Sequence, residues 1–175
     1  INLRPPADRI NGAVGIIGQV EPSKRVPFGV QVMTPITDAQ LVIRGDGSDP
    51  DYVTTCRQEA MTALGSRLKW DGRVASDDVL NDIAVLLFMN PDEPSGRIVA
   101  ESQAGGVIPV VPNAGGSREF VQHGVTGFVY EAEDEGSAID AVRDALRAAN
   151  DPNGVAARAR EHARMSYSPH ANAQK

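Results

Sequence analysis

Short runs of apolar residues alternate with stretches that carry a helical hydrophobic pattern along most of the chain. An unbroken apolar run predicts a strand covered on both faces, as in a parallel sheet, and the clearest one is Ile83–Met89. In this way we predict six strands, at residues 13–18, 40–44, 68–70, 83–89, 107–111 and 126–130.

Apolar residues three or four positions apart predict helices at residues 51–64, 98–104, 117–121, 138–149 and 155–165. Gly65 is typical of the residue that ends the first of them. Ser76, followed by Asp77 and Asp78, is typical of the start of a further helix, because serine caps free amides and acidic residues favour the helix dipole. Alternating strands and helices predict an α/β fold, a Rossmann-like doubly wound parallel sheet of about six strands with helices on both faces.

The predicted sheet directs attention to one of its edges. Ligands of such sheets bind beyond the carboxyl ends of the strands. We therefore expect the loops after the first five strands to share one rim, at residues 18–24, 45–50, 72–76, 90–96 and 112–117. We divide the chain into a connecting segment, 1–12, a ligand-binding domain, 13–165, and a polar tail, 166–175.

Composition excludes several classes of function. The 175 residues carry a net charge of −6, and aromatic residues make up 5%, which argues against binding to nucleic acid. The single cysteine, Cys56, predicts a reducing, cytoplasmic setting. No apolar run is long enough to cross a bilayer. Because Ile1 stands in place of an initiator Met, we expect the chain to be a piece of a longer protein.

The stretch from Glu93 to Glu101 carries the most informative chemistry. Gly96 permits close approach of a ligand to the backbone, and the amides after it open a helix, whose N-terminus attracts phosphate. Carboxylates on either side accept hydrogen bonds from sugar hydroxyls. The pattern therefore indicates a nucleotide-sugar site, with the alternative that both glutamates are solvated surface charges.

Glu93 and Glu101 are the core of a larger resemblance. Together with the motifs around them, they resemble the C-terminal, donor-binding domain of the GT-B-fold retaining glycosyltransferases of the group 1 family. The motifs that carry the resemblance follow in order: Gly15–Gly18 with Lys24, Leu41–Gly47, Leu68–Gly72, Ala104–Gly106, Pro109–Val111, Gly115–Glu119 and Gly124–Gly127.

The resemblance implies a domain that is one half of a GT-B enzyme. Its donor would be a nucleoside-diphosphate sugar, and its acceptor would be held by an N-terminal domain missing from this chain. No metal and no other cofactor is implied, and the chain by itself is expected to be inactive.

The same resemblance assigns roles to particular residues. Lys24 would stabilise the diphosphate and Glu93 would position the transferred sugar, so that these two form the catalytic pair. Glu101 would accept the ribose hydroxyls, and the backbone near Leu68 would meet the base. The full set of residues implied for the nucleotide-sugar site is Gly18, Lys24, Leu68, Lys69, Glu93, Gly96, Arg97, Ile98 and Glu101.

The sequence departs from the family pattern near the phosphate site. Gln19 stands where the family usually has an arginine, and Arg97 stands where it usually has an apolar residue. We hypothesise that Arg97 supplies the charge that is lost at position 19. Two alternatives remain open: a nucleotide-sugar epimerase of similar architecture, and a degenerate binding domain that keeps the fold without the site.

Three arginines in the last predicted helix are most simply a solvated face: Arg158, Arg160 and Arg164. In a full-length enzyme they could instead touch the missing domain or an acidic membrane surface. The predicted location is therefore cytoplasmic, with the inner face of the membrane as the alternative site of action.

Overall fold

The computed structural model describes residues 12–167, and the rest of the predicted connecting segment and residues 168–175 of the tail lie outside it. Within this range, six parallel strands form one sheet in the order β3-β2-β1-β4-β5-β6. The predicted fold class is confirmed. The strands are β1 (Ala13–Ile17), β2 (Gln40–Arg44), β3 (Leu68–Gly72), β4 (Val85–Leu87), β5 (Ile108–Pro112) and β6 (Phe128–Tyr130).

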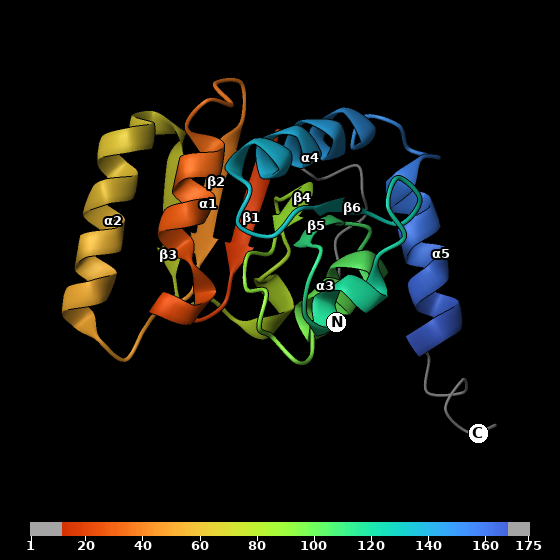
Figure 1. Cartoon of the computed structure of the whole chain (residues 1–175), viewed down its shortest axis with the longest axis horizontal. Coiled ribbons are helices and arrows are strands. Elements are labelled where there is room, and N and C mark those ends of the chain that lie inside the picture. Colours follow the sequence, from red (N-terminus) through yellow and green to blue (C-terminus); the bar gives the residue numbers. More distant parts are fainter. Residues whose placement is uncertain (1–11, 168–175) are drawn as a thin grey trace.

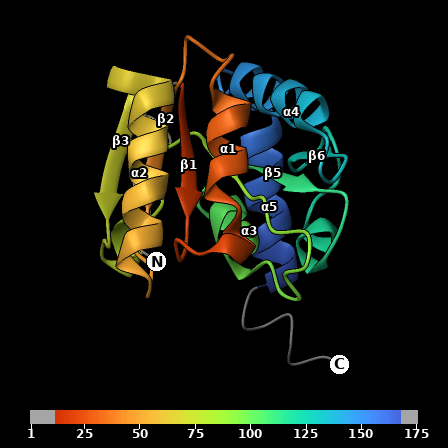
Figure 2. The same cartoon turned by 60° about the vertical axis from the view of Figure 1, so that its left-hand side comes forward.

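Helices cover both faces of the sheet (Figures 1 and 2). Those of the described range are α1 (Val26–Met33), α2 (Pro50–Leu64), α3 (Arg97–Ala104), α4 (Glu135–Ala148) and α5 (Val155–Tyr167), with short 3-10 turns at Pro22–Lys24, Gly65–Arg67, Ser76–Asp78 and Gly116–Phe120. The helices α1, α2 and α4 pack on one face, and α3 packs on the other with α5 beside it. The last helix continues two residues into the stretch predicted as tail.

The sheet has a hydrophobic core on each face. Side chains of one strand reach both cores, because successive residues of a strand point to opposite faces. In β1, Val14 and Ile16 pack beneath α1, α2 and α4, whereas Ala13 joins the smaller core on the other face. The apolar pattern of the strands thus explains why the sheet is buried on both sides.

The sequence pattern did not predict α1. Pro27 and Gly29 disfavour helix, and the β-branched residues Val26, Val30 and Val32 have only a weak preference for it. Pro27 is tolerated because it stands in the first turn, where its missing N–H is not needed. The helix forms because its buried residues pack against the sheet between α2 and α4.

The helix predicted to start at Ser76 is reduced to a single 3-10 turn, Ser76–Asp78. The buried guanidinium of Arg44 explains the difference. Its Nη1 donates to the carbonyl oxygens of Asp78, Val79 and Asn81, at 3.1, 3.0 and 2.5 Å. The Asp78 oxygen also accepts the Asn81 amide at 3.1 Å, so the segment closes one tight turn beside the guanidinium and does not continue as a helix. The prediction of a helix here was wrong.

The strand order reverses direction between β1 and β4, which are adjacent in the sheet although α1, β2, α2 and β3 separate them in the chain. Val14 pairs with Val85 and Gly15 with Leu86. In doubly wound sheets the loops that leave the two central strands diverge at this point and leave a crevice for a ligand. Here those loops are residues 18–24 and 88–96. No helix within residues 12–167 is long and apolar enough to span a membrane.

Candidate nucleotide-sugar site

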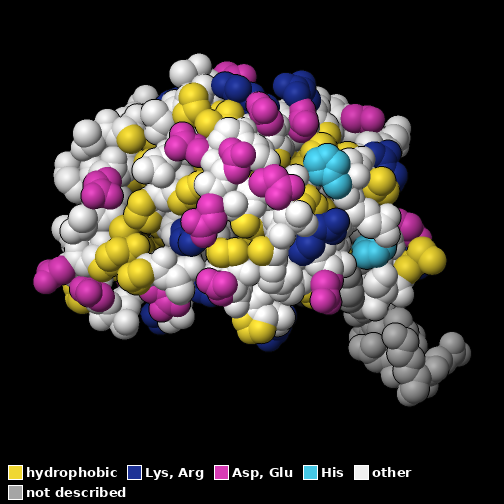
Figure 3. Space-filling view, in the orientation of Figure 1, with side chains coloured by type: hydrophobic (Ala, Val, Ile, Leu, Met, Phe, Trp, Pro, Cys, Tyr) yellow, Lys and Arg dark blue, Asp and Glu magenta, His cyan; other side chains and the backbone are white. Residues whose placement is uncertain are grey.

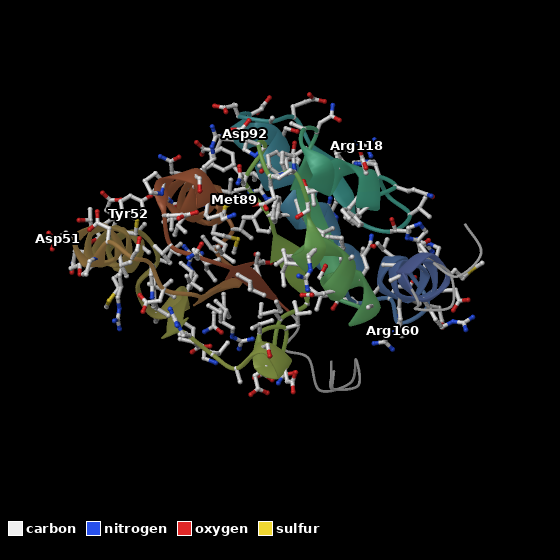
Figure 4. The ribbon with its side chains drawn as sticks, turned by 90° about the horizontal axis from the view of Figure 1, so that it is seen from below. Asp51, Tyr52, Met89, Asp92, Arg118 and Arg160 are labelled. Carbon is white, nitrogen blue, oxygen red and sulfur yellow. The ribbon has the colours of Figure 1, made fainter. Side chains whose placement is uncertain are left out.

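Lys24 and Glu93 meet across the crevice at the carboxyl edge of the sheet. Lys24 ends the 3-10 turn after β1, and Glu93 lies in the loop after β4. The Lys24 Nζ is 2.5 Å from Glu93 Oε2, with side chains 29% and 22% exposed. Figure 4 views the molecule from this edge, where the labelled Met89 and Asp92 mark the loop that carries Glu93. The structure therefore brings the predicted catalytic pair together.

The loop that carries Glu93 is held in place by the loop after β5. The Gly116 amide donates to the Glu93 carbonyl at 2.8 Å. A Cβ at Gly116 would lie 2.2 Å from the Pro94 oxygen, and one at Gly115 would lie 2.4 Å from the Pro91 oxygen. Only glycines allow the two loops to approach this closely, so the backbone of Glu93 is fixed by its neighbour.

Gly96 brings the start of α3 against the segment after β5, since a Cβ at Gly96 would lie 2.8 Å from the Ser117 Cα. The helix has no side-chain cap at this end. The expected contact of the Arg97 amide with phosphate needs correction, because this amide already donates to the Ser95 oxygen at 2.9 Å. The amides of Gly96 and Ile98 donate to no group within residues 12–167, so these two amides of the predicted set are open to an anion.

Two adjoining hollows follow the rim of the sheet. The first has a volume of about 360 Å³ and is lined by Ile17, Gly18, Gln19, Lys24, Phe88, Glu93, Ser95, Arg97 and Ile98. The second has about 280 Å³ and is lined by Ile17, Gly18, Gln19, Arg44, Gly45, Asp46, Arg73, Val74 and Val79. Residues 17–19 line both, so the two hollows adjoin along the loop after β1, and together they are called the groove below.

The wall of the second hollow is built on Arg44, which is 5% exposed. Its Nε donates to Asp71 Oδ2 at 3.0 Å while its Nη1 holds the carbonyls of residues 78, 79 and 81. The guanidinium thus joins β2, β3 and the loop before β4. Its charge is compensated by Asp71, and Lys69 Nζ lies 3.3 Å from the same carboxylate oxygen.

Leu68 and Lys69, which were expected near the base, do not line this groove. They begin β3 and pair with Leu41 and Val42, about 13 Å along the strand from the rim. Parallel strands present ligands at their carboxyl ends, so the rim residues from this strand are Arg73 and Val74. Both residues lie in the loop 72–76, which the sequence predicted to be part of this rim.

Arg97 and Glu101 occupy successive turns of α3. The Arg97 side chain is 86% exposed and its Nη2 lies 3.6 Å from Glu101 Oε1. Arg97 lines the first hollow together with Gln19 and Lys24, whereas Glu101 lines neither hollow. Arg97 and the neutral Gln19 therefore line the same hollow, with the Arg97 guanidinium paired with Glu101.

The surface charge is mixed outside the groove. In Figure 3 the Lys and Arg side chains are scattered among acidic ones, which gather where β6 leads into α4. The arginines of α5 contact their own domain: Arg158 Nε donates to the Val125 oxygen, Arg160 Nη2 to the Gly105 oxygen, and Arg164 pairs with Glu161. Within residues 12–167, no group of three or more His, Cys, Asp or Glu side chains is arranged to hold a metal ion.

The sheet order and the groove at its reversal point define a doubly wound α/β domain with a ligand site at the carboxyl edge. A family model described as glycosyl transferases group 1 matches residues 11–148. The chain belongs to this family.

The names of two curated relatives of the chain refer to sugars. The chain is 32% identical over 150 residues to a GDP-mannose-dependent alpha-mannosyltransferase of Mycolicibacterium smegmatis, with 83% of this chain and 37% of the relative covered. It is 29% identical over 144 residues to N-acetyl-alpha-D-glucosaminyl L-malate synthase of Bacillus anthracis, with coverage of 79% and 37%. The chain thus spans little more than a third of the length of these relatives.

Solved structures share the fold. HepE of Anabaena, solved in complex with UDP and glucose, superposes with a TM-score of 0.79 at 22% identity, over 91% of this chain and 45% of that one. The C-terminal domain of a glycosyl transferase group 1 family protein, LpcC of Francisella tularensis, superposes with a TM-score of 0.78 at 16% identity. This second match covers 92% of this chain and 88% of that domain.

Proposed function

We propose that the chain is the donor-binding domain of a retaining glycosyltransferase, which moves a sugar from a nucleoside diphosphate to an acceptor held by a second domain. The observation that carries the proposal is the Lys24–Glu93 pair, 2.5 Å apart at the reversal point of the sheet, beside the open amides of α3. A cation and free amides suit a diphosphate, and a carboxylate suits sugar hydroxyls. Membership of the family and the names of the relatives support the same function.

In this proposal the donor follows the groove along the rim. The base and ribose occupy the hollow walled by Arg73 and Val74, and the diphosphate crosses Gly18 to reach Lys24. The sugar then lies beside Glu93. Lys24 stabilises the negative charge that develops on the leaving diphosphate, and it does so without moving a proton. Glu93 orients the sugar so that the acceptor attacks the face from which the diphosphate departs.

The acceptor belongs to a second domain in this proposal, because the chain covers only 37% of the length of these relatives. The chain alone then binds donor and transfers nothing. We also propose a cytoplasmic location, which the single, buried and unpaired Cys56 supports.

Calorimetric titration with UDP, GDP and ADP tests the donor site. We expect one of the three to bind, and Lys24→Ala to weaken it about tenfold or more, as the loss of a charged hydrogen bond would do. The matched control is Lys69→Ala, which removes the same charge from a residue outside the groove. An equal effect of both variants would contradict the proposed role of Lys24.

The products distinguish the proposed activity from its alternatives. Joined to an acceptor-binding domain, a transferase releases nucleoside diphosphate as it glycosylates the acceptor, whereas an epimerase yields an altered sugar. Binding of no nucleotide, both alone and in the joined protein, would favour a degenerate domain.

A further inference from the structure

Asn90 is a buried amide directly beside the Lys24–Glu93 pair. It lies in the loop after β4 and is 8% exposed. Its Oδ1 accepts a hydrogen bond from the Asp92 amide at 3.0 Å, and this bond fixes which end of the side chain carries the nitrogen. Nδ2 therefore points to Glu93 and donates to its Oε2 at 3.3 Å.

One carboxylate oxygen of Glu93 thus has two donors of different character. Lys24 is a charged group on a flexible stem, and it is free to follow a stronger anion. Asn90 is neutral and buried, and its own loop holds it in place. The other oxygen, Oε1, has no partner within residues 12–167 and is the one available to a ligand.

A bound diphosphate competes with Glu93 for Lys24, because it offers more negative charge than a carboxylate. When Lys24 turns to the diphosphate, Glu93 loses its closest partner at the moment when it must hold the sugar. The bond from Asn90 does not depend on Lys24 and remains.

On the basis of the proposed donor site, we propose that Asn90 is a positioning residue, which keeps the carboxylate of Glu93 aimed at the sugar while Lys24 is engaged with the diphosphate. In this proposal Asn90 acts on the sugar only through Glu93. Its effect is therefore confined to the extra affinity that the sugar adds to the nucleotide.

The test compares the dissociation constants of a nucleoside diphosphate and its sugar, using UDP with UDP-glucose and GDP with GDP-mannose. The dissociation constant of the nucleoside diphosphate divided by that of its sugar derivative measures the affinity that the sugar adds. Asn90→Asp keeps the shape of the side chain and the bond from the Asp92 amide, but it replaces the donor to Glu93 by an acceptor. We expect this variant to lower the ratio about tenfold, as the loss of a charged hydrogen bond would do.

Two controls separate positioning from charge and from folding. Asn113→Asp adds the same charge at the neighbouring loop of the rim and should leave the ratio within about twofold, since exposed charges interact weakly. Asn90→Ala removes the donor without adding charge and should lower the ratio as Asn90→Asp does. The unfolding midpoint of each variant verifies that it is folded.

A double substitution identifies Glu93 as the group through which Asn90 acts. Glu93→Gln should lower the ratio by itself, and adding Asn90→Ala should lower it no further, since two residues that act as a unit are not additive. An unchanged ratio in both Asn90 variants, beside a lowered ratio in Glu93→Gln, would overturn the role of Asn90 and leave the donor site intact. Absence of nucleotide binding to the unsubstituted chain would overturn both.

Discussion

Lys24 and Glu93 stand 69 positions apart in the sequence, yet their charged groups are in direct contact at 2.5 Å. Each is the counter-ion of the other while the groove is empty. Glu93 therefore acts against diphosphate binding, although it is placed to favour the sugar. A single substitution can separate the two effects.

Glu93→Gln should strengthen the binding of a nucleoside diphosphate that carries no sugar, by about two- to fivefold. A partly exposed ion pair contributes about 0.2–1 kcal/mol, and this is the competition that the substitution removes. Asp92→Asn is the control, because it removes one negative charge from the exposed side chain of the residue that precedes Glu93. If calorimetry shows the same gain for both variants, the gain comes from net charge and the ion pair does not compete with the ligand.

Arg97→Ala should weaken the binding of the nucleoside diphosphate about fivefold, since Arg97 lines the same hollow as Gln19 and supplies a solvent-exposed charge. Gln19→Arg in the Arg97→Ala background should restore the affinity. The idea fails if Arg97→Ala leaves the affinity unchanged while Lys24→Ala abolishes binding.

Gly115→Ala should destabilise the domain by about 3 kcal/mol, because it combines backbone strain with a clash. Gly115 has a φ of +68° and a ψ of −179°, and a Cβ there would lie 2.4 Å from the Pro91 oxygen. Gly124→Ala is the comparison, with a φ of +73° and nothing within 4 Å, and should cost about 1 kcal/mol. Urea denaturation measures the free energy of unfolding of both variants. An equal loss in both would show that the two loops can move apart to accommodate the added methyl group.

Arg44→Ala should destabilise the domain by about 2–3 kcal/mol, because it leaves Asp71 and three carbonyl oxygens without the guanidinium. Arg44→Lys keeps the charge but cannot reproduce the fork of donors, so it should recover only part of the loss. Full recovery by lysine in thermal denaturation would mean that the charge alone matters.

The sequence predicted most of the sheet because an unbroken apolar run such as Ile83–Met89 leaves few alternatives. It could not predict what depends on tertiary contacts. The propensity of Ser76 to start a helix is overridden by Arg44, which lies 32 positions earlier and binds three carbonyl oxygens of this segment, so that it turns tightly beside the guanidinium. The helix α1 is formed by packing, against the preference of Pro27 and Gly29.

The candidate site was predictable where a residue type carries the chemistry, as with Lys24 and Glu93. It was not predictable where geometry alone assigns the role. Asn90 has no distinguishing motif, and only its buried bonds connect it to Glu93. Arg73 lies in the predicted rim loop 72–76, whereas the expectation for Leu68 came from the family resemblance and placed the base near the start of the strand and not near its end.

The reversal of strand order has a consequence for how the site comes into being. Lys24 follows a strand of one half of the sheet and Glu93 follows a strand of the other, with the seam between them at Val14–Val85 and Gly15–Leu86. Whichever half acquires its structure first during refolding, the groove is absent until both have docked along this seam. Nucleotide binding is therefore a direct assay for the completion of folding, and a fluorescent nucleotide added during refolding would time that final step.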